Sequence, residues 1–214
     1  MLKVWGRKTS VNVQKVMWTV AELGLKSERV DVGGAFGGLD TAEFARLNPN
    51  RQIPVIEDAG VTLWESGAII RHLSRTYGAG GLYPSDAKAV ARADQWMDWA
   101  LTSIYPDIIS SIFIGLIFTP KASRNTAAVE TSIARAGERL SVLDAHLASR
   151  PYMLGDTLTM ADIPAGSLMY RYFTLPISRP SLPNVEAWYA RLQQRPAYRD
   201  HVMIDYSGLK VPGA

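Results

Sequence analysis

The chain has no cysteine among its 214 residues, and only three histidines. The lack of cysteine excludes disulfides, cysteine-ligated metals and any mechanism in which the protein's own thiol attacks a substrate. The histidines (His72, His146 and His201) stand far apart in helix-like or terminal contexts, without the spacing of metal ligands. We therefore expect no metal site.

The chain also lacks a large excess of either positive or negative charge. The formal net charge is +3, from 23 basic and 20 acidic residues, and the basic residues are spread along the chain. This balance argues against a nucleic-acid partner, although it suits an anionic ligand. With 47% hydrophobic and 20% charged residues, the composition is that of an ordinary globular protein.

Long apolar runs are few, and we expect none of the length that spans a bilayer, hence no membrane partner. The first residues, Met1 to Trp5, lead directly into a strand with no signal peptide ahead of it. The expected location is cytoplasmic.

Residues 1–78 alternate strand and helix signals. Leu2–Trp5 is a predicted strand, and apolar residues then recur at helical spacing from Val13 until Gly24 ends that helix. The remaining predicted elements are a strand at Lys26–Val32, a helix at Thr41–Leu47, strands at Val55–Asp58 and Val61–Leu63, and a helix at Ala68–Tyr77. This order, with a parallel crossover between the first two strands, predicts an α/β domain of the thioredoxin-like type.

Strand signals almost disappear after a glycine-rich linker at residues 79–86. From residue 87 to 214 the sequence predicts an all-helical C-terminal domain. Its expected helices cover Ala87–Pro106 with a continuation through Ile108–Ile117, then Thr126–Ser149, and a third beginning at Thr159–Asp162. In the third, Thr159 and Asp162 form a variant of the capping box, which supplies structure rather than chemistry.

The most specific segment is Asn48–Ser66. Pro54 removes a backbone N–H at the start of a strand and makes Ile53 extended, so that the main chain of Ile53 can be held toward a ligand. Ser66 opens a helix whose N-terminus carries a partial positive charge and favours a carboxylate. Together they outline a site for a small anionic peptide.

This segment resembles the glutathione site of the glutathione S-transferase family, whose pattern is N-P-x-x-x-[VI]-P, two strands, then E-S-x-A-I. The matching residues are Asn48, Pro49, Ile53, Pro54, Glu65, Ser66, Ala68 and Ile69. The resemblance implies that Pro54 is cis, that Ile53 pairs main chain to main chain with the cysteinyl part of glutathione, and that Glu65 and Ser66 hold its γ-glutamyl end. Gln52 and Arg51 are the implied contacts of the glycyl end, although Arg51 could equally be a surface charge.

Glutathione must react as a thiolate, and with a pKa near 8.5 only roughly 3% of a free thiol is ionised at pH 7. One well-placed hydroxyl is enough to shift this balance. Ser10 is the candidate, because in the serine-type members of the family, which this chain resembles, the activating serine stands six residues before the helix valine matched here by Val16. Thr9 is a weaker alternative, and the structural alternative is that Ser10 or Asn12 merely caps the helix. Trp5, where other classes have tyrosine, departs from the tyrosine-type pattern.

Ser10-x-Asn12 is also similar to the Thr-x-Asn motif of bacterial members, including the Nu class, that reduce disulfides with bound glutathione. Three functions follow as hypotheses: conjugation of glutathione to small apolar electrophiles in detoxification, glutathione-dependent reduction of disulfides or peroxides, and a non-catalytic binding module. Tyr105, Ile109 and Phe113 are the candidate electrophile pocket, and the resemblance implies a homodimer.

Overall fold

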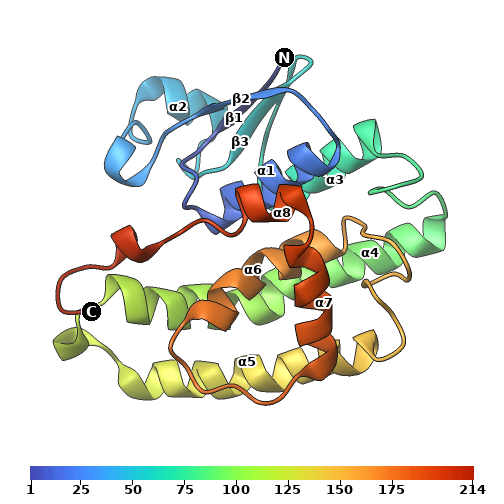
Figure 1. The fold of residues 1–214 in the computed structure, drawn as a ribbon. Coiled ribbons are helices and arrows are strands. Elements are labelled where there is room, and N and C mark those ends of the chain that lie inside the picture. Colours follow the sequence, from blue (N-terminus) through green and yellow to red (C-terminus); the bar gives the residue numbers. More distant parts are fainter.

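The computed structural model describes all residues, 1–214, and consists of a small mixed sheet with its helices above a bundle of helices (Figure 1). The sheet has the order β2-β1-β3-β4, with β1 parallel to β2 and antiparallel to β3, and β3 antiparallel to β4. The elements of this part are β1 (Leu2–Trp5), α1 (Val11–Glu22), β2 (Ser27–Val30), α2 (Ala42–Leu47), β3 (Val55–Asp58), β4 (Val61–Trp64) and α3 (Ser66–Tyr77), with one 3₁₀ turn at Gly34–Phe36.

The remaining elements are helical. They are α4 (Ala87–Trp99), its π-helical continuations Ala100–Ile104 and Pro106–Phe118, α5 (Thr126–Leu147), α6 (Asp162–Thr174), α7 (Pro183–Gln193) and α8 (Pro196–His201), with 3₁₀ turns at Lys121–Ser123 and Ser207–Leu209. The predicted fold class, thioredoxin-like followed by all-helical, is confirmed. The largest apolar core lies among α4 to α8, and a smaller one lies between the sheet and helices α1 and α3.

The predicted continuation of the helix beyond Pro106 is confirmed. The helix runs without interruption from Ala87 to Phe118, and Tyr105 keeps helical angles of φ −60° and ψ −45° although a proline follows it. The wider π-type turns around Pro106 pair each N–H with a carbonyl five residues earlier, so the hydrogen-bond ladder is already re-registered where the proline lacks a donor.

This helix corrects the expectation about apolar length. Ala87–Phe118 is long and apolar enough, by length and composition alone, to cross a membrane. That is weak evidence, because core helices pass the same test. Here the helix lies along α5 and α6, and its one acidic residue in the apolar stretch, Asp107, is fully buried between two arginines of α5.

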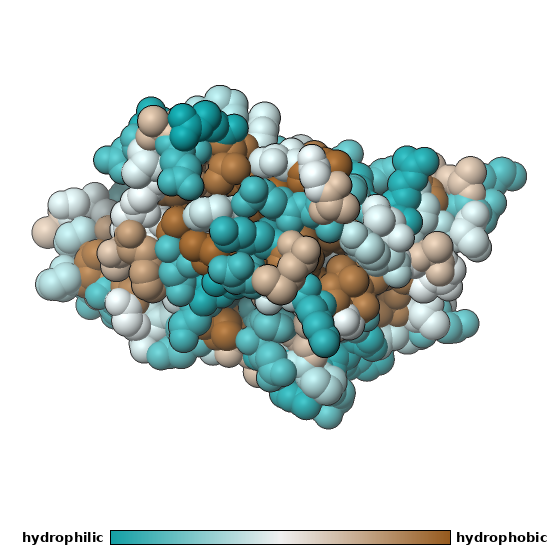
Figure 2. Space-filling model, turned by 90° about the horizontal axis from the view of Figure 1, so that it is seen from above, coloured by the Kyte–Doolittle hydropathy of each residue, from teal (hydrophilic) through white to brown (hydrophobic).

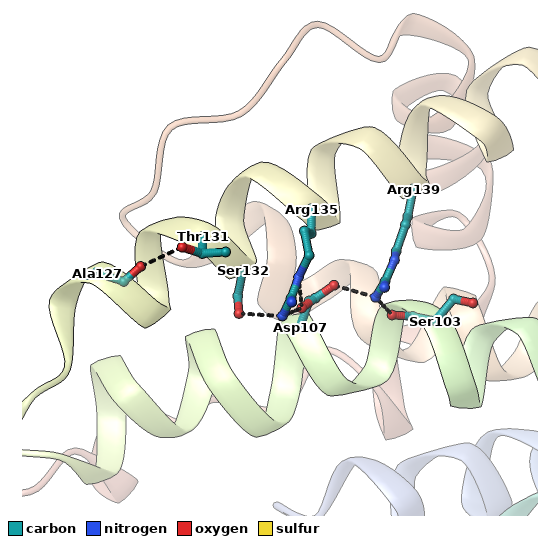
Figure 3. A network of polar contacts seen from close by, with 7 residues as sticks. All are labelled: Ser103, Asp107, Ala127, Thr131, Ser132, Arg135 and Arg139. Atoms are coloured by element: carbon teal, nitrogen blue, oxygen red, sulfur yellow. Dashed lines mark hydrogen bonds and ion pairs between the residues drawn. The ribbon is translucent and has the colours of Figure 1, made fainter.

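Figure 3 shows this buried carboxylate between the two helices. Arg135 donates to Asp107 over 2.6 Å and Arg139 over 2.5 Å, and Arg139 also donates to the carbonyl of Ser103. Both arginines are partly exposed, with side-chain exposures of 51% and 37%. The network joins α5 to the continuation of α4 at its centre.

The predicted capping box at the start of α6 forms only in part: the Asp162 carboxylate accepts from the backbone N–H of Thr159, but the Thr159 hydroxyl accepts no helix N–H. The Asp162 carboxylate accepts from the N–H and hydroxyl of Thr159, from the N–H of Met153 and from the indole N–H of Trp188. It therefore joins the preceding loop, α6 and α7.

Helix α1 lies between the sheet and the bundle, against α3 on one side and α6 and α8 on the other (Figure 1). Gly166 of α6 makes the approach close, because a Cβ there would lie 2.9 Å from the Trp18 ring. Glu22 of α1 pairs with Arg195 over 2.6 Å. Seen from above, the surface carries separate apolar patches among polar side chains (Figure 2).

Candidate functional site

Ser10 stands at the N-cap of α1 with an extended backbone (φ −78°, ψ 124°), and its side chain makes no capping hydrogen bond. The hydroxyl of Ser10 is therefore not used by the helix, so the alternative in which this side chain merely caps α1 does not hold. The loop before it depends on Gly6, with φ +147°. A Cβ at Gly6 would lie 2.4 Å from Val13 and 3.3 Å from Ile53, so the glycine lets the start of α1 approach the Ile53 loop.

The Ile53–Pro54 peptide bond is cis, which confirms the expectation drawn from the resemblance. No group of the protein hydrogen-bonds to the N–H or C=O of Ile53. The loop that carries Ile53 is fixed instead by the buried Asn48, whose side-chain amide donates to the carbonyl of Gln52 over 2.8 Å. An extended ligand thus finds a donor and an acceptor on one residue.

Glu65 and Ser66 mark the start of α3. Glu65 has φ +69°, its side chain is exposed, and the following Ser66 is 6% exposed. The hydroxyl of Ser66 lies 3.5 Å from the side-chain oxygen of Asn12, so α1 and α3 bring their N-termini together. Two helix N-termini at one place favour an anionic group there.

Arg51 and Gln52 are both exposed on the loop before Ile53. The guanidinium of Arg51 donates to the carbonyl of Asp40 over 2.7 Å, and Arg51 itself has φ +53°. Its side chain is directed at a neighbouring loop in this structure.

Asn12 is not a cap but the centre of a small network that links three elements. Its amide NH₂ donates to the Tyr105 hydroxyl over 3.3 Å, and its oxygen accepts from Lys15 over 3.0 Å as well as from Ser66. Burial raises the pKa of the Tyr105 phenol. Asn12 and Tyr105, predicted for different parts of the site, are thus in contact.

Of the predicted electrophile pocket, only Tyr105 is brought next to the other candidates. Ile109 and Phe113 are 7% and 4% exposed and belong to the large core. Phe113 packs edge-on against Tyr206, with ring centroids 5.1 Å apart. Apolar residues at helical spacing here face mainly the protein interior.

The sequence analysis did not identify two buried cationic residues next to the site, Lys15 and Arg171. Lys15 is 2% exposed, and burial lowers its pKa to about 7. Arg171 of α6 is 1% exposed and donates to the side chain of Gln14 over 2.7 Å and to the carbonyl of Thr9 over 2.8 Å. The signal for Lys15 is a charge among the apolar positions of α1. No sequence signal marks Arg171, because its role depends on the packing of α6 against α1, which the local sequence does not show.

A thioredoxin-like domain with a cis-proline loop, beside a free hydroxyl at a helix N-terminus and an all-helical second domain, defines the class of glutathione-dependent transferases. The comparisons agree. Residues 1–75 match the glutathione S-transferase N-terminal domain and residues 93–196 the C-terminal domain.

The chain is 36% identical over 209 residues to glutathione S-transferase GstB of Escherichia coli strain K12, covering 97% of this chain and 100% of the relative. It is 32% identical to glutathione S-transferase 3 of Zea mays, over 94% and 93% of the two chains. The glutathione-bound theta class glutathione S-transferase of Xanthomonas axonopodis pv. citri superposes with a TM-score of 0.90 at 42% identity, over 95% and 98% of the chains. This chain belongs to the glutathione S-transferase family and is a transferase enzyme.

Proposed function

We propose that the chain binds glutathione against Ile53 and conjugates its thiolate to small apolar electrophiles, with Ser10 as the hydroxyl that stabilises the thiolate. The single observation that carries this assignment is the unused hydroxyl of Ser10 at the start of α1, the helix that Gly6 lets approach the loop of Ile53 with its unpaired main chain. Glu65 and Ser66 hold the γ-glutamyl end in this proposal, and Arg51 and Gln52 the glycyl end.

The chemistry needs little from the protein beyond this. A hydrogen bond to a charged group contributes about 1.5–3 kcal/mol, which lowers a thiol pKa by about one to two units. The thiol proton leaves to solvent, and the thiolate attacks the electrophilic carbon. The carbon–sulfur bond forms as the leaving group departs with its electron pair.

Substitution of Ser10 tests the proposal. Ser10→Ala should lower kcat/KM for an activated aryl halide at least about tenfold and leave the Kd of glutathione nearly unchanged, since a single contact to the sulfur is lost. Ser85→Ala, in the exposed linker, is the matched control. Wild-type turnover in Ser10→Ala would remove Ser10 from this role, and the same substitution at Thr9 would then be measured.

Reduction of disulfides with bound glutathione is the second candidate, and it would require Asn12 to contact the sulfur. In this structure both ends of the Asn12 amide are engaged, by Tyr105 on one side and by Lys15 and Ser66 on the other. That engagement favours conjugation. Fast turnover of a small disulfide, with negligible conjugation, would reverse the order of the two.

The finer assignments remain part of the same proposal. They are a glutathione-binding domain at 1–78, a linker at 79–86 and a helical domain at 87–214, with a cytoplasmic location, a role in detoxification, and no nucleic-acid or membrane partner. Members of the family are usually dimeric, and we infer a homodimer. Trp64 and Leu101 are apolar side chains that are 37% and 42% exposed in the single chain, and in this proposal the partner subunit covers them. Light scattering at micromolar concentration measures the molecular mass of the protein in solution and so tests the homodimer.

A further inference from the structure

Charge is matched unevenly in the interior. The three buried acids, Asp58, Asp107 and Asp162, each have partners: a histidine and a tyrosine, two arginines, and a set of N–H and hydroxyl donors. The two buried cations, Lys15 and Arg171, have no acid within ion-pair distance. Burying an ion without an opposite charge is costly.

Both cations lie under the same turn, the start of α1. Arg171 reaches the Thr9 carbonyl, directly before Ser10, and its Nε–H is buried without a hydrogen-bond partner. Lys15 has three N–H donors and a single hydrogen-bond acceptor, the oxygen of Asn12. Its ammonium also stands over the Tyr105 ring, 4.8 Å from the centroid.

We propose that Lys15 is a positioning residue of the glutathione site: it fixes the Asn12 amide between Ser66 and Tyr105, and it supplies the buried positive charge that balances the thiolate of the bound cosubstrate. The inference rests on the proposed function, since it takes the missing anion to be the sulfur held at Ser10.

The charges and the burial around Lys15 are consistent with this role. Burial is the main reason that the pKa of Lys15 falls to about 7, the positive charge of Arg171 lowers it further, and Glu65 raises it. The other groups that face Lys15 are Tyr105 and, around a small cavity that it shares with Ser66, Arg71 and Asp98, which pair with one another. An anion bound at the start of α1 therefore meets an ammonium that is poorly solvated and has no ion-pair partner, and the anion's charge favours the protonated form of Lys15.

The test measures the ionisation of glutathione bound to the full-length protein, from the ultraviolet absorbance of the thiolate as a function of pH. Lys15→Gln keeps a donor toward Asn12 and removes the charge, whereas Lys15→Met removes both. We expect both variants to raise the pKa of the bound thiol by about one unit or more, with the larger shift in Lys15→Met. Lys15→Arg restores a charge and should return it toward the wild-type value.

Lys26→Met is the control, because it changes net charge equally at an exposed site and should leave the bound thiol's pKa unchanged. An unshifted pKa in both Lys15→Gln and Lys15→Met, with glutathione bound, overturns the inference. Failure of the proposed function is distinguishable, because wild-type protein would then show no calorimetric binding of glutathione, or Ser10→Ala would leave the wild-type thiol pKa unaltered.

Discussion

Arg171 and Thr9 are 162 residues apart in sequence, and the guanidinium of the first donates to the carbonyl of the second over 2.8 Å. With its other terminal nitrogen Arg171 holds the side chain of Gln14 over 2.7 Å. The helical half of the chain thus fixes the turn that carries Ser10. A hydroxyl that must meet a sulfur at hydrogen-bond distance requires such support.

Replacement of Arg171 by lysine should separate support from charge. Lysine keeps the positive charge but cannot reach two acceptors with one planar fork. We expect Arg171→Lys to lower kcat/KM for conjugation about fivefold to tenfold while the protein stays folded by circular dichroism. Arg179→Lys, whose contacts stay within the helical half, is the control. Equal activity of Arg171→Lys and wild type would show that the fork does not position Ser10.

Removal of the Asp162 carboxylate should be among the most destabilising single changes. Asp162→Ala leaves four donors without their acceptor in a fully buried place, and we expect a loss of about 3–5 kcal/mol of unfolding free energy. Urea denaturation measures it against Asp156→Ala, an exposed acid in the same loop. A difference below about 1 kcal/mol between the two variants would contradict the assigned role.

The Asp107 network predicts an asymmetry. Arg135→Met together with Arg139→Met leaves a buried carboxylate without its cations, whereas Asp107→Leu leaves two arginines that are already partly in water. The double arginine variant should therefore lose at least about 3 kcal/mol, and more than Asp107→Leu. Restoring stability by adding Asp107→Leu to the double variant would complete the test by urea denaturation. Equal losses of unfolding free energy in all variants would contradict this asymmetry and would show that packing, not charge pairing, determines the stability contributed by this network.

Lys15 predicts a specific pH dependence of stability without ligand. Its pKa falls from 10.5 to about 7 on folding, so between pH 7 and 10 the unfolded chain binds more protons than the folded one. The unfolding free energy of wild type should then rise with pH across this window relative to Lys15→Met, by on the order of a few kcal/mol. Below pH 7, Lys15→Met should be the more stable. Parallel curves from pH 6 to 10 would contradict this.

The fold could be read from local patterns to a large extent. Leu2–Trp5 and Val55–Asp58 form strands with the predicted bounds, and Thr41 caps α2 with its side chain. Pro106 is instructive, since a proline inside a helix normally kinks or ends it, whereas here the helix continues beyond it as predicted. The rule fails where the helix has already shifted to i→i+5 bonding, a feature that only the packed helix displays.

The candidate site could be predicted in part. Residues in one motif, such as Ile53, Pro54 and Ser66, are close in sequence, and their conformations follow from proline chemistry and helix termini. Helical spacing could not show whether Ile109 and Phe113 line a pocket or belong to the core, because both environments require the same apolar side chains.

The sequence by itself pointed to the cosubstrate, through the resemblance of Asn48–Ser66 to the family's glutathione site, and to the candidate hydroxyl at Ser10, because the residues of a motif and their turn and strand chemistry are local in sequence. Only the tertiary structure decided that Ser10 is not used as a cap, that Asn12 joins Ser66 to Tyr105, and that Lys15 and Arg171 bring two unpaired positive charges beneath the same turn. Whether a charge is buried, and what balances it, depends on which helices pack together, and no local pattern contains that information.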